Sequence, residues 1–465
     1  MSIQNKAPGS DSRSTPRQIR LGLFMHPLGQ HVGGWRHPEA EGSSTSIQWL
    51  TRIAQTAERG GFDMVFVGDS LTSSQHRLPS TASRLEPFTL LAALAGQTRH
   101  IGLAATASTT FDQPFHLARA LSSIDHISNG RAAWNVVTSF SAGAALNFGR
   151  DDLPSHGERY EIASEFLEVT HKLWDGWLSG AVVKDKVEGK FLNDALIRPA
   201  DHRGKHFSVA GPLNIERSPQ GRPVIIQAGS SEAGQDLAAR SAEVVFTAAP
   251  TLEEGQAFYA EQKRRVVNAG RKPEHLLILP GVMPIVGRTD EEAQATWREL
   301  NEWVDIDNGL KQLSARFGLD LSSYPLDGPV PDPGTVEGGR SRVKLLLDKS
   351  ERENLTLRQL AAIAAGSRGH RVVVGTAQTI ADDLQQWFEQ GAADGFNIMP
   401  AIMPTQLDLF VELVIPELRR RGIFRERYEF STLRENLGLP ALPATPPASD
   451  SDLPPRMNSD IKARA

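Results

Sequence analysis

Short apolar runs alternate with longer stretches of helical periodicity along most of the chain. Eight runs, rich in β-branched and aliphatic residues, predict strands at residues 19–25, 64–67, 100–107, 131–137, 223–227, 244–247, 276–282 and 395–400. The run Met64–Val67 is apolar at every position, which is typical of a parallel strand buried on both faces. The pattern therefore favours a sheet whose strands are separated by crossover helices.

Between these runs, apolar residues recur at intervals of three and four, which predicts amphipathic helices. The expected helices cover residues 47–59, 86–94, 114–127, 155–177, 232–242, 252–269, 289–304, 377–390 and 407–421. This regular alternation predicts an α/β fold, a (β/α)8 TIM barrel. A doubly wound open sheet is the alternative, but no G-x-G-x-x-G motif follows the first strand, which disfavours a Rossmann fold.

Two long segments interrupt the alternation, after strands four and seven. Residues 178–221 lack a long pattern and are expected to form an insertion with room for a small hairpin. Residues 305–371 are expected to form a long crossover, with 322–342 too rich in Gly and Pro for regular structure; a lid and an excursion without a role are both open. The expected organisation is a disordered leader at 1–18, a single barrel domain at 19–438 and a disordered tail at 439–465.

The composition of the 465 residues is that of an ordinary soluble protein, with 40% hydrophobic and 23% charged residues. A formal net charge of −5 gives no basic face for nucleic acid, so a small organic substrate is expected instead. The absence of cysteine excludes disulfides, thiolate catalysis and cysteine-ligated metal centres. No apolar run approaches the roughly 18 residues of a membrane span, and we expect a cytoplasmic protein without a membrane partner.

Polar side chains follow several predicted strands at their carboxyl ends, where barrel enzymes place their chemistry. Asp69 comes two residues after the strand at 64–67, and Thr138 and Ser139 follow the strand at 131–137. Asp69 could equally cap the next turn. The two hydroxyls are candidates for hydrogen bonds to a ligand at this end of the barrel.

Two further groups lie at predicted helix starts. His156 and Tyr160 are four residues apart and share one helix face, although a surface helix with two incidental polar aromatics is the simpler interpretation. Ser230 and Ser231 precede another helix, whose free N–H groups and dipole favour a phosphate. The Gly-Lys-Ser/Thr ending of a P-loop is absent there, so a mononucleotide hydrolase is not indicated.

The loop after the first strand contains His31, Trp35 and His37, which invites a metal hypothesis. The histidine spacings fit no common zinc pattern, and none of the 13 histidines forms an H-x-H or H-E-x-x-H motif. A metal-dependent hydrolase is therefore disfavoured, and we expect no metal site. Contact with the substrate, or a purely structural role, is the better interpretation of these three residues.

Five longer motifs occur in order: RLEPFTLLAALA, HLARALSSIDHISNGRAAWNVVTS, GERYEIASEFLEV, VIIQAGSS and VGTAQTIADDLQQWFEQGAADGFNIMP. With these motifs the chain resembles the flavin-dependent monooxygenases of the luciferase-like superfamily. It is most similar to the family of nitrilotriacetate, dibenzothiophene-sulfone and long-chain alkane monooxygenases. The resemblance runs from about residue 19 to residue 427, and the five motifs in this order are specific to it.

The resemblance implies a two-component enzyme. A separate NAD(P)H:flavin reductase would supply reduced FMN, and this chain would bind it and activate O2 as a flavin C4a-hydroperoxide to oxygenate a small sulfur-, amine- or alkane-type substrate. The family's FMN contacts match Asp69, Thr106, His156, Tyr160 and Ser231 by position, and Thr138, Ser139 and Ser230 are added to them. A homodimer or homotetramer is expected from the family's habit.

His156 is the expected catalytic residue, because an imidazole near a flavin can hold or deliver a proton at neutral pH. His31, Trp35 and His37 are the expected substrate contacts. Two other functions stay open. A related enzyme of the same superfamily could use a deazaflavin and pass hydride without oxygen, and a non-catalytic flavin-binding protein would bind the cofactor without turnover.

Overall fold

The computed structural model describes residues 17–73, 82–333 and 340–443. The leader expected at 1–18 and the tail expected at 439–465 lie almost wholly outside these ranges, and so does part of the Gly- and Pro-rich stretch at 322–342.

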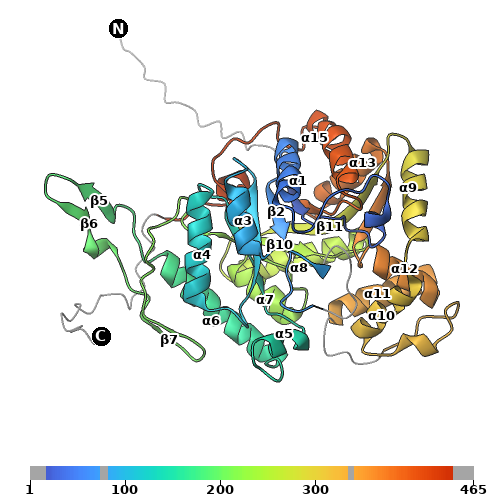
Figure 1. Cartoon of the computed structure of the whole chain (residues 1–465), viewed down its shortest axis with the longest axis horizontal. Helices are drawn as coiled ribbons and strands as arrows, with labels where there is room; N and C mark the ends of the chain where they lie inside the picture. Colours follow the sequence, from blue (N-terminus) through green and yellow to red (C-terminus); the bar gives the residue numbers. More distant parts are fainter. Residues whose placement is uncertain (1–16, 74–81, 334–339, 444–465) are drawn as a thin grey trace, which may run out of the picture.

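Eight parallel strands close into a ring. The helices around it hide much of the ring in Figure 1. In spatial order they are β1 (Arg20–Phe24), β2 (Met64–Val67), β3 (Gly102–Ser108), β4 (Ala132–Val137), β9 (Val224–Gln227), β10 (Val244–Thr247), β11 (Leu277–Val286) and β13 (Gly395–Ile398). The ring closes through β1, which pairs with β2 on one edge and with β13 on the other. The predicted (β/α)8 barrel is confirmed, and all eight predicted strands lie within two residues of their expected starts.

Helices follow the strands and cover the outside of the ring. They are α1 (Ile47–Gly60), α3 (Pro87–Ala95), α4 (Pro114–Ile127), α6 (His156–Trp174), α7 (Glu232–Ser241), α8 (Leu252–Asn268), α9 (Asp290–Glu302) and α13 (Ala377–Glu389). A short helix after β4, α5 (Ala142–Asn147), was not predicted. It spans fewer than two turns, too little for a periodic pattern to show.

The last helix of the barrel is interrupted where the sequence predicted a continuous one from 407 to 421. It consists of α14 (Thr405–Leu409), a π-helical turn (Phe410–Val414) and α15 (Ile415–Arg420). Pro416 explains the interruption, since proline has no N–H to donate and its ring collides with the carbonyl four residues earlier.

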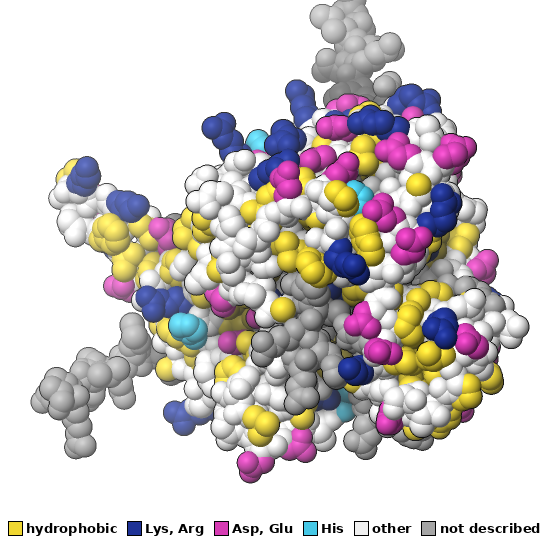
Figure 2. Space-filling model, turned by 45° about the vertical axis from the view of Figure 1, so that its right-hand side comes forward, with side chains coloured by type: hydrophobic (Ala, Val, Ile, Leu, Met, Phe, Trp, Pro, Cys, Tyr) yellow, Lys and Arg dark blue, Asp and Glu magenta, His cyan; other side chains and the backbone are white. Residues whose placement is uncertain are grey.

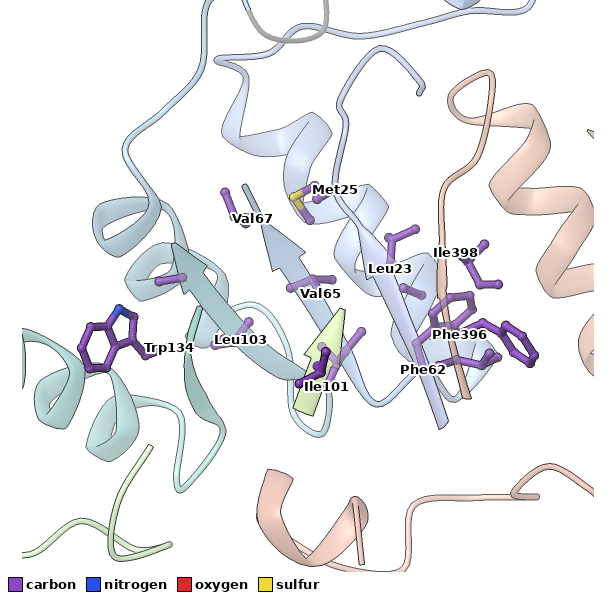
Figure 3. Packing of buried hydrophobic residues seen from close by; sticks show 14 of the residues in the cluster. Leu23, Met25, Phe62, Val65, Val67, Ile101, Leu103, Trp134, Phe396 and Ile398 are labelled. Atoms are coloured by element: carbon purple, nitrogen blue, oxygen red, sulfur yellow. The ribbon is translucent and has the colours of Figure 1, made fainter. Parts of the chain in front are cut away.

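Two apolar layers hold the barrel together. Leu23, Val65 and Leu103 point outward from their strands into the layer beneath the helices (Figure 3). The inward-facing residues, among them Met64 and Ala104, form a second cluster inside the ring. Leu433 of α16 (Leu433–Asn436) closes this inner cluster at the amino ends of the strands.

The insertion after α6 forms two hairpins rather than one. Strands β5 (Val182–Asp185) and β6 (Lys190–Leu192) pair antiparallel in an arm that projects from the barrel (Figure 1). A shorter pair follows, β7 (His202–Arg203) with β8 (Ser208–Val209).

The second insertion, expected as a long crossover at 305–371, contains more regular structure than the sequence predicted. It contains α10 (Ile306–Phe317), α11 (Arg340–Glu353) and α12 (Leu357–Gly366), which share an apolar cluster of their own. A ninth parallel strand, β12 (Arg371–Gly375), then pairs with the outer half of β11. These helices were not predicted, because two short apolar faces escaped notice; they are Leu310, Leu313 and Phe317, and Leu357, Leu360 and Ala361.

The irregular structure expected at 322–342 is found at residues 322–333, whereas α11 begins at residue 340. One 3-10 turn (Leu321–Ser323) overlaps its start, and no helix or strand follows among residues 324–333.

The loop after β1 packs on this second insertion. His31 is 1% exposed, and its ring meets the edge of Trp297 on α9 at 5.8 Å between centroids. The end of α12 lies so close that a Cβ at Gly366 would come within 2.8 Å of His31 Nε2. Burial, and then the charge of Arg368, lower the pKa of His31 to about 4.

The molecular surface carries charges of both signs. On the face seen in Figure 2, acidic and basic side chains are interspersed, without a large area of one sign. Among the described residues, no helix is both long enough and apolar enough to cross a membrane.

We predict that Asp63→Ala destabilises the barrel by about 3–5 kcal/mol, since it leaves the buried Arg425 without its partner. Asp63 Oδ2 also accepts the Leu21 N–H at 2.7 Å, so the variant weakens the junction between β1 and the start of β2. Urea unfolding measures the loss. Asp327→Ala, which breaks an exposed ion pair with Arg358, is the control and should change little; an equal effect of the two variants would contradict the prediction.

His31 predicts a pH dependence of stability. Well above pH 6.5 its ring is neutral in both the folded and unfolded states, and the full contribution to stability is present. Between pH 6.5 and about 4, the unfolded chain takes up a proton that the buried ring does not, so this contribution falls as the pH falls.

The test compares the wild type with His31→Asn, whose amide oxygen can still accept the Gly33 N–H as Nδ1 does at 3.1 Å. The difference in unfolding free energy between the two should shrink by roughly 2 kcal/mol from pH 7 to pH 4.5. A difference that stays constant over this range would show that the ring of His31 is not held neutral.

Candidate active site at the barrel mouth

Hydroxyl groups from neighbouring strands meet at the carboxyl ends of β3 and β4. Thr106 lies opposite Asn135 in the strand register, and its hydroxyl accepts from Asn135 Nδ2 at 2.9 Å. Ser108 and Ser139 are joined through their hydroxyls at 2.8 Å. Thr110 Oγ1 donates to the carbonyl of Thr138 at 2.7 Å. Thr138 and Ser139 are thus hydrogen-bonded to residues that follow or end β3, and Thr106 lies on the same strand. The contact of these three residues with a flavin stays a prediction.

A second polar group lies where α6 approaches α7. The hydroxyls of Tyr160 and Ser231 are 3.2 Å apart, and Ser231 caps α7 by accepting the Gly234 N–H at 3.2 Å. A Cβ at Gly234 would lie 2.9 Å from the Tyr160 hydroxyl oxygen and 3.1 Å from Gly229 Cα. Only backbone without a side chain fits here, and such a turn suits an anion at a helix start.

Ser230 and His156 lie at the outer edge of this group. Ser230 is exposed, and its carbonyl accepts from Gln235 Nε2 at 2.9 Å. His156 is the exposed first residue of α6, and its ring centroid is 5.0 Å from that of Tyr160. Ser155 caps this helix by accepting the Glu158 N–H.

Asp69 lies just beyond β2, beside Arg84 at 3.6 Å. Burial raises the pKa of its carboxyl above the usual range, although a hydrogen bond from the Ser70 backbone and the charge of Arg84 oppose the shift. Asp112, which accepts the Ser108 N–H at 2.9 Å, also has a pKa raised by burial, and the charge of Asp69 contributes to it. The charge of Asp69 thus acts on Asp112, which accepts a hydrogen bond from Ser108 at the end of β3.

Three phenylalanines form an apolar floor inside the ring. Phe66 lies between Phe24, at 4.9 Å, and Phe246, at 4.5 Å between ring centroids. Phe66 and Phe246 belong to the buried inner cluster, and Phe24 is half-buried against it. A planar group above this floor would contact apolar carbon below and hydroxyls at its rim.

The residues of the β1 loop are separate from these contacts. His31 is buried against α9, His37 Nε2 is 3.8 Å from Glu299 of the same helix, and Trp35 is half-exposed. Their role toward a substrate stays a prediction.

Two residues of the site escaped the sequence interpretation. Asn135 is 3% exposed, and its Oδ1 has no hydrogen-bond partner among the described residues. As an amide in the otherwise apolar strand AAWNVV, it gave a signal that could have been used. Arg159 reaches back from α6 to the carbonyl of Ser139, a contact across 20 residues that no local pattern reveals.

One cavity of the described structure lies elsewhere. It encloses about 440 Å3 between residues 177–182, 216–221 and the segment around α16, at the amino ends of the strands. Barrel enzymes use the opposite end, and none of the hydroxyl residues above lines this cavity. We therefore place the candidate active site at the carboxyl ends.

Sequence comparison finds close relatives over nearly the full length. The chain is 47% identical to N-acetyl-S-(2-succino)cysteine monooxygenase of Bacillus subtilis, covering 92% of this chain and 98% of that protein. It is also 47% identical to nitrilotriacetate monooxygenase component A of Aminobacter aminovorans, covering 91% and 97%.

Solved structures agree. DmoA of Hyphomicrobium sulfonivorans matches with a TM-score of 0.83 at 33% identity, over 90% of this chain and 92% of that one. The riboflavin lyase RcaE, solved with modified FMN and riboflavin, matches with a TM-score of 0.79 at 31% identity, over 91% and 96%. An F420-dependent reductase of Methanopyrus kandleri matches at 14% identity, a likeness that shows the fold alone.

The model of the luciferase-like monooxygenase family matches residues 27–394, most of the barrel. The resemblance seen in the five sequence motifs is thereby confirmed, and the oxidoreductase chemistry expected of the chain is that of its close relatives. The chain belongs to the luciferase-like monooxygenase family.

Proposed function

We propose that this chain is the oxygenase component of a two-component monooxygenase, which binds reduced FMN and transfers one oxygen atom from O2 to a small organic substrate. The observation that carries the proposal is the Tyr160–Ser231 pair at the start of α7. The strand before α7, β9, pairs with β4, and Ser139 beyond the end of β4 is bonded to Ser108 of β3. Together they offer an anion site and a polar rim above an apolar floor.

The residues fit the phosphate of FMN. The hydroxyls of Ser230, Ser231 and Tyr160 would hold it, and the first N–H groups of α7 with the helix dipole would stabilise its charge. Gly229 and Gly234 leave room for the phosphate to approach the backbone. The fit rests on the donor set, since each of these groups donates hydrogen bonds or can do so.

The residues also fit the flavin ring. Thr106 accepts from Asn135, so its own proton is available to a ring acceptor, and the buried Asn135 Oδ1 is an acceptor in need of a donor. Asp69 would accept from a ribityl hydroxyl or a ring N–H, and Thr138 and Ser139 would contact the ring edge. Reduced flavin supplies the electrons that activate O2, and the phenylalanine floor would keep water away from that reaction.

A separate NAD(P)H:flavin reductase is the proposed partner. The relative from Aminobacter aminovorans is named component A, which points to a second component in that system. No G-x-G-x-x-G motif follows the first strand of this chain, which agrees with nicotinamide oxidation on another protein. We further propose a cytoplasmic homodimer or homotetramer.

We propose a sulfur- or amine-type substrate in preference to an alkane. The relatives named for N-acetyl-S-(2-succino)cysteine and nitrilotriacetate are each 47% identical to this chain, whereas the long-chain alkane monooxygenase of Geobacillus thermodenitrificans is 34% identical. His31, Trp35 and His37 on the β1 loop are the proposed substrate contacts.

The proposal predicts that the purified chain, given chemically reduced FMN and 18O2, adds one labelled oxygen atom to a substrate from a panel of sulfur, amine and alkane compounds. Product mass and oxygen uptake are the readouts. Hydrogen peroxide without a labelled product for every compound would contradict the monooxygenase. Turnover of reduced deazaflavin without oxygen uptake would favour the hydride-transfer alternative, and flavin binding without either reaction would favour a binding protein.

For His156 we propose a role in holding or delivering a proton near the flavin. The prediction is that His156→Asn lowers the yield of oxygenated product per reduced FMN by roughly tenfold or more, as expected for loss of a general acid or base. His116→Asn, on the outer helix α4, is the control. Unchanged flavin affinity and unchanged yield in the His156 variant would remove the proposed role.

A further inference from the structure

The first turn of α6 contacts two strand-end loops with consecutive residues. Tyr160 reaches the loop after β9 through Ser231, and Arg159 reaches the loop after β4 by donating from Nη1 to the Ser139 carbonyl. Successive residues on a helix point about 100° apart, so one turn can serve both loops. The phosphate side and the ring side of the proposed flavin site are therefore linked through a single turn.

Ser139 needs such support, because its backbone is in the left-handed region with φ +49°. A residue other than glycine pays roughly 1–2 kcal/mol for that conformation, which persists only when the surroundings enforce it. Two contacts of Ser139 enforce it here: its hydroxyl meets Ser108, and its carbonyl accepts from Arg159.

In the described structure, the guanidinium of Arg159 donates to one acceptor, the carbonyl of Ser139. Burial lowers its pKa from the usual range, so desolvation disfavours its charge at this position. Its Nε is buried and has no hydrogen-bond partner among the described residues. Holding a partly buried cation against a backbone carbonyl costs free energy, which is consistent with a functional role for the geometry that it maintains.

We propose that Arg159 is a positioning residue for the flavin: it holds Ser139 in the left-handed conformation and thereby sets the hydroxyls of Thr138 and Ser139 against the ring. This inference rests on the proposed function, since it concerns the same site. Arg159 acts through the Ser139 carbonyl and not as a cation for the phosphate.

The experiment measures the dissociation constant of reduced FMN, anaerobically, for the wild type, Arg159→Met, Ser139→Gly and the double variant. Arg159→Met should raise the constant about tenfold, within the range expected for losing a hydrogen bond to a charged group. Glycine adopts the left-handed region without strain, so in the Ser139→Gly background the same change should raise the constant less than about twofold. Arg159→Lys, which keeps a cationic donor, should recover part of the affinity.

Arg271→Met is the matched control. Arg271 is also partly buried and donates to backbone carbonyls, those of Ala239, Ala242 and His275, but it lies at the amino ends of the strands. The Arg271→Met variant should have a lower melting temperature than the wild type and an unchanged flavin dissociation constant in the folded protein.

Each outcome decides one question. Equal effects of Arg159→Met in the wild-type and Ser139→Gly backgrounds would show direct action on the flavin and overturn the inference, and so would an unchanged dissociation constant in the single variant. A wild type that binds no reduced FMN would instead overturn the proposed function.

Discussion

The site depends on the closure of the barrel through β1. This strand carries none of the proposed hydrogen-bonding contacts to the ligand, yet its two edges pair with β2 and β13, and only a closed ring makes the carboxyl ends of all eight strands converge on one mouth. Asp63 secures the closure, because its carboxylate binds both the Leu21 N–H and the guanidinium of Arg425 from the far end of the described chain. The hydroxyls of β3 and β4 lie near the turn before α7 as a result of this geometry.

Periodicity predicted the ring well because parallel barrel strands are buried on both faces and their helices are buried on one. The runs at 64–67 and 244–247 were found for that reason. Prediction failed where these conditions do not hold. The strand β12 has a partner on one side only, and its apolar run of three valines in RVVVG is too short to stand out. The helices α10 and α12 pack on each other and not on the sheet, with narrow apolar faces.

For the site, local chemistry and the family motifs together indicated the residues that the structure brings together. Ser231 was recognisable at the start of a predicted helix, and Tyr160 was recognisable through the motif GERYEIASEFLEV as a position that matches the family's FMN contacts. Arg159 was not recognisable, although it is adjacent to Tyr160, because its function depends on the backbone conformation of a residue 20 positions earlier. A positive φ at a serine is a property of the folded loop, and no pattern of side chains encodes it.

The ten-residue strand β11 belongs to two structures at once. Its first half pairs with β10 and β13 in the ring, and its second half pairs with β12, which follows the helical insertion in the chain. A continuous strand with five paired residues on β12 resists bending far more than a loop does, so the end of the insertion has a fixed register against the barrel. The end of α12, where Gly366 lies against His31, is thus held in a fixed position relative to the barrel. If His31 contacts the substrate as proposed, its surroundings on this side are then set by the side chains of α12 and not by the opening of a loop.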